Sequence, residues 1–148
     1  MGCENKIDDE NLSLRVNPGV GLAVEAGDSI IKEIIDDYNQ SSFKRADGSL
    51  DLTTIVDRTT DFLKKYGLED KNEMQTVAGI TIYPVDYFSP IDMSSGRLIK
   101  TVNTRSIHHY AASWVDKKSA MRGKIYRFIR RILGKKIAGF VQKIFHRG

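Results

Sequence analysis

Two adjacent histidines, His108 and His109, are the residues of this 148-residue sequence whose types and spacing point most clearly to chemistry. Ser113 and Trp114 follow them after a gap of three residues. A neutral imidazole can bind a divalent metal, and a protonated one can hold a phosphate oxygen. A hydroxyl and an indole N–H are donors that can hold sugars and phosphates. Spacing alone leaves structural roles as the more common explanation for these residues. Neighbouring strand side chains point to opposite faces, so we expect only one histidine to face a given site.

A second group of interest is the segment 83–88, which places aromatic side chains beside Asp86. Such a platform would suit carbohydrate binding, although core packing is the commoner reason for an aromatic cluster. The acidic pair Asp36 and Asp37 is expected on a solvated helix face and not in a metal site. The sequence contains no P-loop, dinucleotide fingerprint, nucleophile elbow or His-Glu-x-x-His motif. Nothing in the sequence therefore indicates a P-loop, dinucleotide-binding, nucleophile-elbow or His-Glu-x-x-His enzyme.

The charges of the chain are divided very unevenly between two regions. Residues 1–116 hold 12 basic and 19 acidic residues, a net charge of −7, whereas residues 117–148 hold 11 basic residues and no acidic one. Such asymmetry is typical of an interaction segment, so we expect a body over 1–116 and a basic tail over 117–148. Cys3 is the only cysteine, which excludes an internal disulfide and a cysteine-based zinc site. With no signal-type apolar stretch, we expect a cytoplasmic protein.

The order of expected elements in the body predicts an α/β fold with an incomplete sheet. Two helices are expected, one capped by Asp28 and one running from near Thr53 to a stop at Gly67. The remaining segments are expected to be a loop at 5–13, strands at 20–24, 79–84 and 105–110, an extended aromatic segment at 87–90, and a loop at 91–97.

The tail is expected to be helical over 117–146, in two pieces broken near Gly134. Its apolar residues fall into two stripes, Ile125, Phe128, Ile129, Ile132 and Leu133, then Ile137, Val141, Ile144 and Phe145. A basic amphipathic helix is typical of an element attracted to anionic lipid. Packing against the body, with a solvated charged face, is an equal alternative. Nucleic-acid binding is disfavoured, because the body is acidic and aromatic residues are not interleaved on the charged face.

Residues 1–116 resemble the bacterial capsular-polysaccharide glycosyltransferases of glycosyltransferase family 32. The most specific part of the resemblance is the ending Ile-His-His-aromatic-x-x-Ser-Trp at 107–114. The other segments that carry it are Asn17-Pro18-Gly19, Gly27-Asp28, Tyr38, Asp47 to Val56, Gly79 to Pro84, Tyr87-Phe88 and Asn103-Thr104.

This resemblance implies a GT-A-like fold, a nucleotide-sugar donor and a divalent cation, usually Mn²⁺. It gives His108 the role of a metal ligand, and His109, Ser113 and Trp114 the role of donor diphosphate and sugar contacts, with no catalytic residue assigned. The acceptor would be a growing capsular or surface polysaccharide, in lipid-linked form. The tail would then attach the enzyme peripherally to the inner face of the cell membrane.

The sequence departs from this family in one respect that bears directly on activity. It contains no Asp-x-Asp motif, which in the family supplies the metal carboxylates. The chain therefore resembles the back half of the enzyme, a partial GT-A-like fold, and we expect the isolated chain to be inactive. The alternative is a non-catalytic α/β module or truncated remnant that binds a membrane or a partner.

Overall fold

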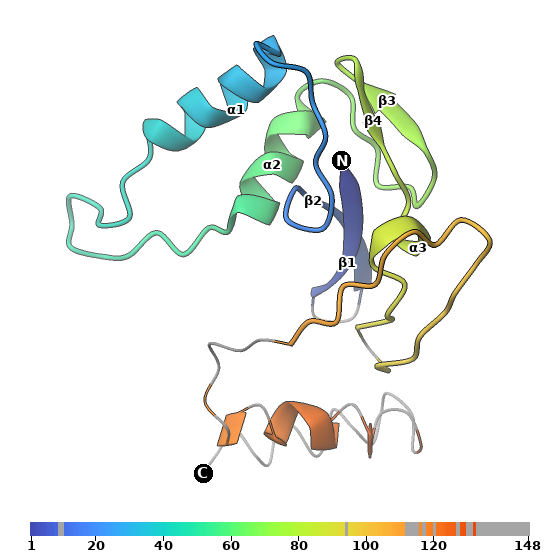
Figure 1. Cartoon of the computed structure of the whole chain (residues 1–148). Helices are drawn as coiled ribbons and strands as arrows, with labels where there is room; N and C mark the ends of the chain where they lie inside the picture. The colour runs from blue at the N-terminus through green and yellow to red at the C-terminus, as the bar shows by residue number, and fades with distance from the viewer. Residues whose placement is uncertain are drawn as a thin grey trace.

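The protein has a mixed α/β fold with small antiparallel sheets, which confirms the expected class in its coarse form. The computed structural model describes residues 1–8, 11–93, 95–111, 116, 118–119, 121–126, 128–129 and 132. Within these residues, β1 pairs with β2 and β3 pairs with β4, both antiparallel (Figure 1). The elements are β1 Gly2–Asp8, β2 Asn11–Asn17, α1 Ser29–Asn39, α2 Ile55–Lys64, β3 Gln75–Val77, β4 Ile80–Ile82 and α3 Val85–Phe88.

The hairpin of β1 and β2 lies where a loop was expected, so the prediction for residues 5–13 was wrong. The register pairs Gly2 with Asn17 and continues to Asp8 opposite Asn11. β1 is rich in Glu, Asn, Lys and Asp, which are poor strand formers in isolation. The backbone hydrogen bonds with β2 hold β1 as a strand, although its own composition does not favour one. In β2, Leu14 and Val16 are buried and alternate with polar residues, the normal pattern of a half-buried strand.

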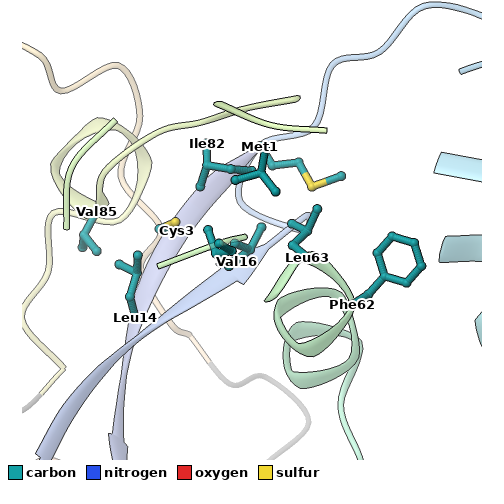
Figure 2. Packing of buried hydrophobic residues seen from close by; sticks show 10 residues of the cluster. Met1, Cys3, Leu14, Val16, Phe62, Leu63, Ile82 and Val85 are labelled. Carbon is teal, nitrogen blue, oxygen red and sulfur yellow. The ribbon is translucent and has the colours of Figure 1, made fainter. Parts of the chain in front are cut away.

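The core lies where the hairpin meets α2 and β4 (Figure 2). Leu63 of α2, Ile82 of β4 and Val16 of β2 are fully buried at its centre. Its other buried apolar members are Met1, Cys3, Leu14, Phe62, Leu68, Val77 and Val85. α1 contributes less, because Ile30, Ile31 and Ile34 are only partly buried against this cluster. α1 therefore faces the core with these three isoleucines, whereas Ile35 and Tyr38 further along it are exposed.

Burial also changes the chemistry of the first residues of β1. The α-ammonium of Met1 donates a 2.7 Å hydrogen bond to the carbonyl of Thr81, and burial lowers its pKa. Burial raises the pKa of the Cys3 thiol to about 12, although the nearby ammonium partly offsets this. Cys3 is 1% exposed. The thiol is therefore held protonated and out of reach of solvent.

The ends of both long helices agree with the sequence signals. The Asp28 carboxylate accepts from the Ile31 N–H at 2.9 Å, and the Thr54 hydroxyl accepts from the Asp57 N–H at 3.1 Å. α2 thus begins within two residues of the expected start. Gly67 adopts a φ of 93°, and the following Leu68 N–H donates to the carbonyl of Leu63. This left-handed glycine ends α2 as expected.

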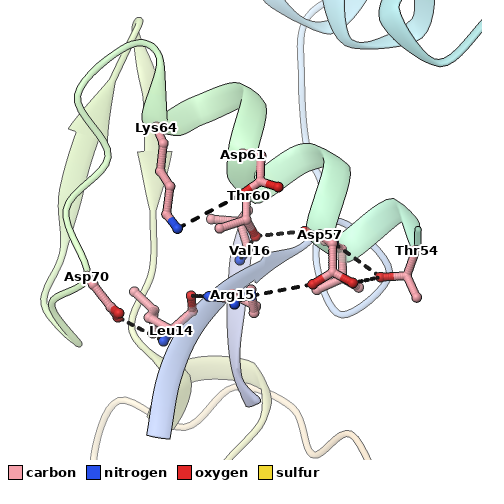
Figure 3. Close-up of polar contacts among 10 residues, drawn as sticks. Leu14, Arg15, Val16, Thr54, Asp57, Thr60, Asp61, Lys64 and Asp70 are labelled. Carbon is pink, nitrogen blue, oxygen red and sulfur yellow. Dashed lines mark hydrogen bonds and ion pairs between the residues drawn. The ribbon is translucent and has the colours of Figure 1, made fainter. Parts of the chain in front are cut away.

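Side chains, and not a third strand, satisfy part of the outer edge of β2 (Figure 3). The Thr60 hydroxyl accepts from the Val16 N–H at 2.9 Å and donates to the Val56 carbonyl at 2.7 Å. The Asp70 carboxylate accepts from the Leu14 N–H at 2.8 Å. Because buried backbone donors must be paired, these two side chains close the strand edge against α2 and the segment that follows it.

Three other expected elements differ from the structure. Residues 20–24, expected to be a strand, form none; the Gly21 carbonyl accepts a hydrogen bond from the Gly2 N–H of the hairpin. The segment 87–90 is not extended throughout, because Val85–Phe88 forms α3 directly after Pro84, a residue suited to a helix start. Residues 105–110 form no strand. Their backbone donors pair with the end of a helix instead.

In the tail, residues 118–119, 121–126, 128–129 and 132 are helical. The expected break near Gly134 and the second apolar stripe lie outside the described residues. Among the helices of the described part, none combines the length and apolar character needed to cross a membrane.

Candidate functional site

The segment 101–108 is bound tightly to α3, and this positions the histidine pair. The Asp86 carboxylate accepts from the Thr101 hydroxyl at 2.7 Å and lies 3.5 Å from the Asn103 amide nitrogen. The Thr104 hydroxyl donates to the Asp86 backbone carbonyl at 2.9 Å. Asp86 therefore holds the segment 101–104 against α3. These contacts favour a structural role for its carboxylate over carbohydrate binding.

The next residues pair with the carbonyls at the end of α3. The N–H groups of Arg105 and Ser106 donate to the Tyr87 carbonyl at 2.8 and 3.2 Å, and the His108 N–H donates to the Phe88 carbonyl at 3.0 Å. The last carbonyls of a helix have no partner within it, which explains why this segment pairs with α3 and forms no strand. The backbone of His108 is fixed as a result.

The two histidines lie in different surroundings. The His108 ring is partly buried and packs edge-on against Tyr110, with ring centroids 4.4 Å apart, whereas His109 is exposed. Burial raises the pKa of the Tyr110 hydroxyl to about 12, with Ser89 and Glu4 beside it. Within the described residues, neither the Tyr110 nor the Ser89 hydroxyl completes a hydrogen bond of good geometry. The surroundings of the Tyr110 ring, against which His108 packs, therefore include two buried hydroxyls without such a bond.

A cleft of about 810 Å³ lies on the other side of Phe88. Its aromatic wall is formed by Tyr83 and Phe88, whose rings meet edge-to-face with centroids 5.6 Å apart. Two acidic residues, Glu25 and Asp28, are also among its lining residues, and the Asp28 carboxylate caps α1. The remaining lining residues come from both chain segments that meet there: Met1, Gly21, Leu22, Ala23, Val24, Gly79, Ile80 and Thr81. A wall of aromatic rings can contact the apolar face of a sugar, and an acidic side chain such as Glu25 can accept hydrogen bonds from its hydroxyls.

Gly2 allows the Phe88 ring to form this wall. A Cβ atom at Gly2 would lie 2.7 Å from Phe88 Cδ2 and 2.8 Å from Val20 Cγ2, both closer than real contacts. At Gly21 the nearest atom to such a Cβ is also on Phe88, at an ordinary 3.4 Å. The ring therefore rests on the backbone of β1, where no side chain could be accommodated without a shift.

The structure brings the expected site residues together only in part. Tyr83 lines the cleft, whereas His108 and His109 do not; Phe88 links the two features, because its ring faces the cleft and its carbonyl binds His108. Ser113 and Trp114 lie outside the described residues. In the described part of the chain, no group of three or more His, Cys, Asp or Glu side chains could hold a metal ion.

The cleft residues Glu25 and Asp28 are not site candidates on the sequence alone, which identifies Asp28 only as a helix cap. The cleft forms because residues 21–25 and 79–81 meet in space, and periodicity within each segment does not report such a meeting. The only sequence signal is the group of glycines at 19, 21 and 27, which marks an irregular segment.

Comparison with known proteins finds no relative: no protein-family model, no curated protein and no solved structure matches this chain.

Proposed function

We propose that the chain is the C-terminal portion of a glycosyltransferase that moves a sugar from a nucleotide-sugar donor to a growing capsular or surface polysaccharide. The observation that carries the proposal is the fixed position of the Ser-Ile-His-His segment. Its His108 backbone is bonded to Phe88, whose ring forms the aromatic wall of the cleft. A donor site that holds both a diphosphate and a sugar needs cationic or N–H donors beside an apolar ring face.

The proposed chemistry is stabilisation of charge on the departing nucleoside diphosphate. The exposed His109 is free to approach a ligand, and Ser113 and Trp114 would add a hydroxyl and an indole N–H. The cleft would receive the sugar against Tyr83 and Phe88. A divalent cation would need carboxylates from outside this sequence, which lacks Asp-x-Asp, so no step is assigned to Mn²⁺.

A non-catalytic α/β module is the second candidate function. It is favoured by the absence of Asp-x-Asp from the sequence and of a three-ligand cluster from the described residues. The two candidates differ in whether the histidine segment contacts a nucleotide sugar. DNA upstream of Met1 that encodes an in-frame Asp-x-Asp segment would decide in favour of the enzyme.

Titration of the purified chain with nucleotide sugars, followed by NMR of the histidine side chains, tests the proposal. We expect UDP-glucose, UDP-N-acetylglucosamine or GDP-mannose to shift the His109 imidazole signals, and to shift amide signals of Tyr83 and Phe88. His109→Gln should weaken the binding by about tenfold or more, the loss of one hydrogen bond to a charged group. Lys100→Gln, which changes an exposed residue outside the site, is the matched control.

The same samples test whether the site is complete. We expect no release of nucleoside diphosphate with Mn²⁺ present, because the described residues offer no metal cluster. Turnover would show that the chain is a complete enzyme and contradict the view that it is one portion of a site. Absence of any shift at His109 with all three donors would contradict the donor-binding proposal and favour the non-catalytic module.

A further inference from the structure

The described part of the tail presents an apolar helix face that nothing in the described structure covers. Met121 is 60% exposed, Ile125 44%, Phe128 63% and Ile132 61%. These four side chains are therefore not packed on the described part of the body. In α2, by contrast, Phe62 and Leu63 are buried. The tail face therefore has a different role from the helix faces that build the core.

These four side chains form one narrow stripe. At 3.6 residues per turn, positions 121, 125, 128 and 132 fall within an arc of about 60°. Exposed Lys118 and Lys124 fall at the two edges of this arc, with Arg122 beyond Lys118. Long basic side chains at the borders of an apolar stripe can extend to a charged interface while their stems stay on apolar surface. This is the arrangement that a helix lying in a membrane surface requires.

Charge identifies the occupant of this face. Residues 117–148 contain 11 basic and no acidic residues, so the surface that covers the stripe must be both apolar and anionic. In a second copy of the chain, the basic residues that border the stripe would face the same positive charges here, and this repulsion opposes pairing of two tails. A nucleic acid would use the charge but leave four apolar side chains in water. An anionic lipid bilayer satisfies both requirements at once.

We propose that the tail docks on an anionic lipid surface, with Met121, Ile125, Phe128 and Ile132 inserted at the boundary between headgroups and acyl chains. Lys118, Arg122 and Lys124 then contact lipid phosphates. This attachment is independent of the glycosyl-transfer proposal, because it uses none of the cleft or histidine residues. Both would hold together for an enzyme whose acceptor is linked to lipid.

Co-sedimentation of the whole chain with vesicles tests the docking. We expect binding to vesicles in which about a third of the phosphatidylcholine is replaced by phosphatidylglycerol, and much weaker binding to phosphatidylcholine alone. Phe128→Asp should lower the partition coefficient by about tenfold or more, because a large apolar side chain no longer inserts. Leu52→Asp is the matched control, since Leu52 is 75% exposed but lies in the body; it should leave binding unchanged.

Removal of charge gives a second, independent measurement. Lys118→Gln and Lys124→Gln should each lower binding to the anionic vesicles by about fivefold, and raising the salt from about 0.1 M to about 1 M should lower it further. Lys100→Gln should have no effect. Circular dichroism of each variant confirms that the body stays folded.

Three outcomes would overturn the docking proposal. The first is equal binding of the Phe128→Asp and Leu52→Asp variants to anionic vesicles. The second is RNA binding by the chain without vesicle binding. The third is that the chain does not bind vesicles but self-associates in analytical ultracentrifugation, and that Phe128→Asp abolishes this self-association. None of these outcomes depends on nucleotide-sugar binding, so the two proposals can fail separately.

Discussion

Replacement of Leu63 by alanine is expected to lower the free energy of unfolding by about 3–5 kcal/mol, the cost of truncating a large side chain in a tightly packed core. Leu63 is fully buried on α2, where the helix packs against the β1–β2 hairpin and β4. Its removal leaves a cavity in a core that has few other buried apolar residues to fill it. Denaturation in urea, followed by circular dichroism, measures the change from the shift in midpoint at constant slope.

Two variants keep this test informative if Leu63→Ala does not fold. Leu63→Met conserves volume and should cost less than about 1.5 kcal/mol. Leu52→Ala removes the same atoms from a residue that is 75% exposed and should stay within about 0.5 kcal/mol of the parent. A midpoint for Leu63→Ala equal to that of Leu52→Ala would show that the core does not lie where Figure 2 draws it.

The second large effect is expected from one of two neighbouring threonines. Thr60→Val should lower the free energy of unfolding by about 1–3 kcal/mol, because the buried Val16 N–H loses the hydroxyl that accepts it. Thr59→Val is the matched control. Thr59 is 1% exposed, and its hydroxyl has no hydrogen-bond partner within the described residues, so the same change should be neutral or stabilising.

Amide hydrogen exchange separates this explanation from a general loss of packing. Thr60→Val should speed exchange at Val16 more than at Leu14, whose N–H is held by Asp70. Equal destabilisation by Thr59→Val and Thr60→Val would mean that shape, and not the strand-edge hydrogen bond, makes these positions sensitive.

The sequence predicts best those elements whose signals are local. Asp28 before α1 and Gly67 after α2 are a cap and a stop that act within about one helical turn, and the structure has them in these roles. The start expected near Thr53 is also close, because α2 begins at Ile55 with Thr54 as its cap. The turn residues near Gly48 act over the same short range. Such signals need no knowledge of the rest of the fold.

The elements that depend on distant partners could not be predicted in the same way. β1 is a strand because β2 pairs with it, and its own composition gives no sign of this. Residues 20–24 are apolar as a strand would be, yet they form no strand, and residues 21–24 line a cleft. The alternation of Leu14 and Val16 with polar neighbours is a usable signal for β2, although it is short. Residues 105–108 pair with the carbonyls of α3, a helix too short to be detected by periodicity.

The candidate site also has one part that the sequence identifies and one part that only the fold brings together. The histidine pair is identified by residue type, whereas the cleft and its link through Phe88 follow from tertiary structure. Asp86 illustrates the error of interpreting a carboxylate without its neighbours, because Thr101 occupies it from 15 residues away. Residue type thus identifies candidate site residues, and only the structure shows which of them already hydrogen-bond to other parts of the protein.

The buried thiol of Cys3 makes the protein its own reporter of strand opening. A maleimide reacts with an exposed thiolate, and this thiol is 1% exposed with a pKa of about 12. Cys3 is also the only cysteine in the sequence, so every modified molecule gains a single adduct mass. The rate of that mass change reports how often β1 leaves the sheet, and no cysteine has to be engineered into the protein for the measurement.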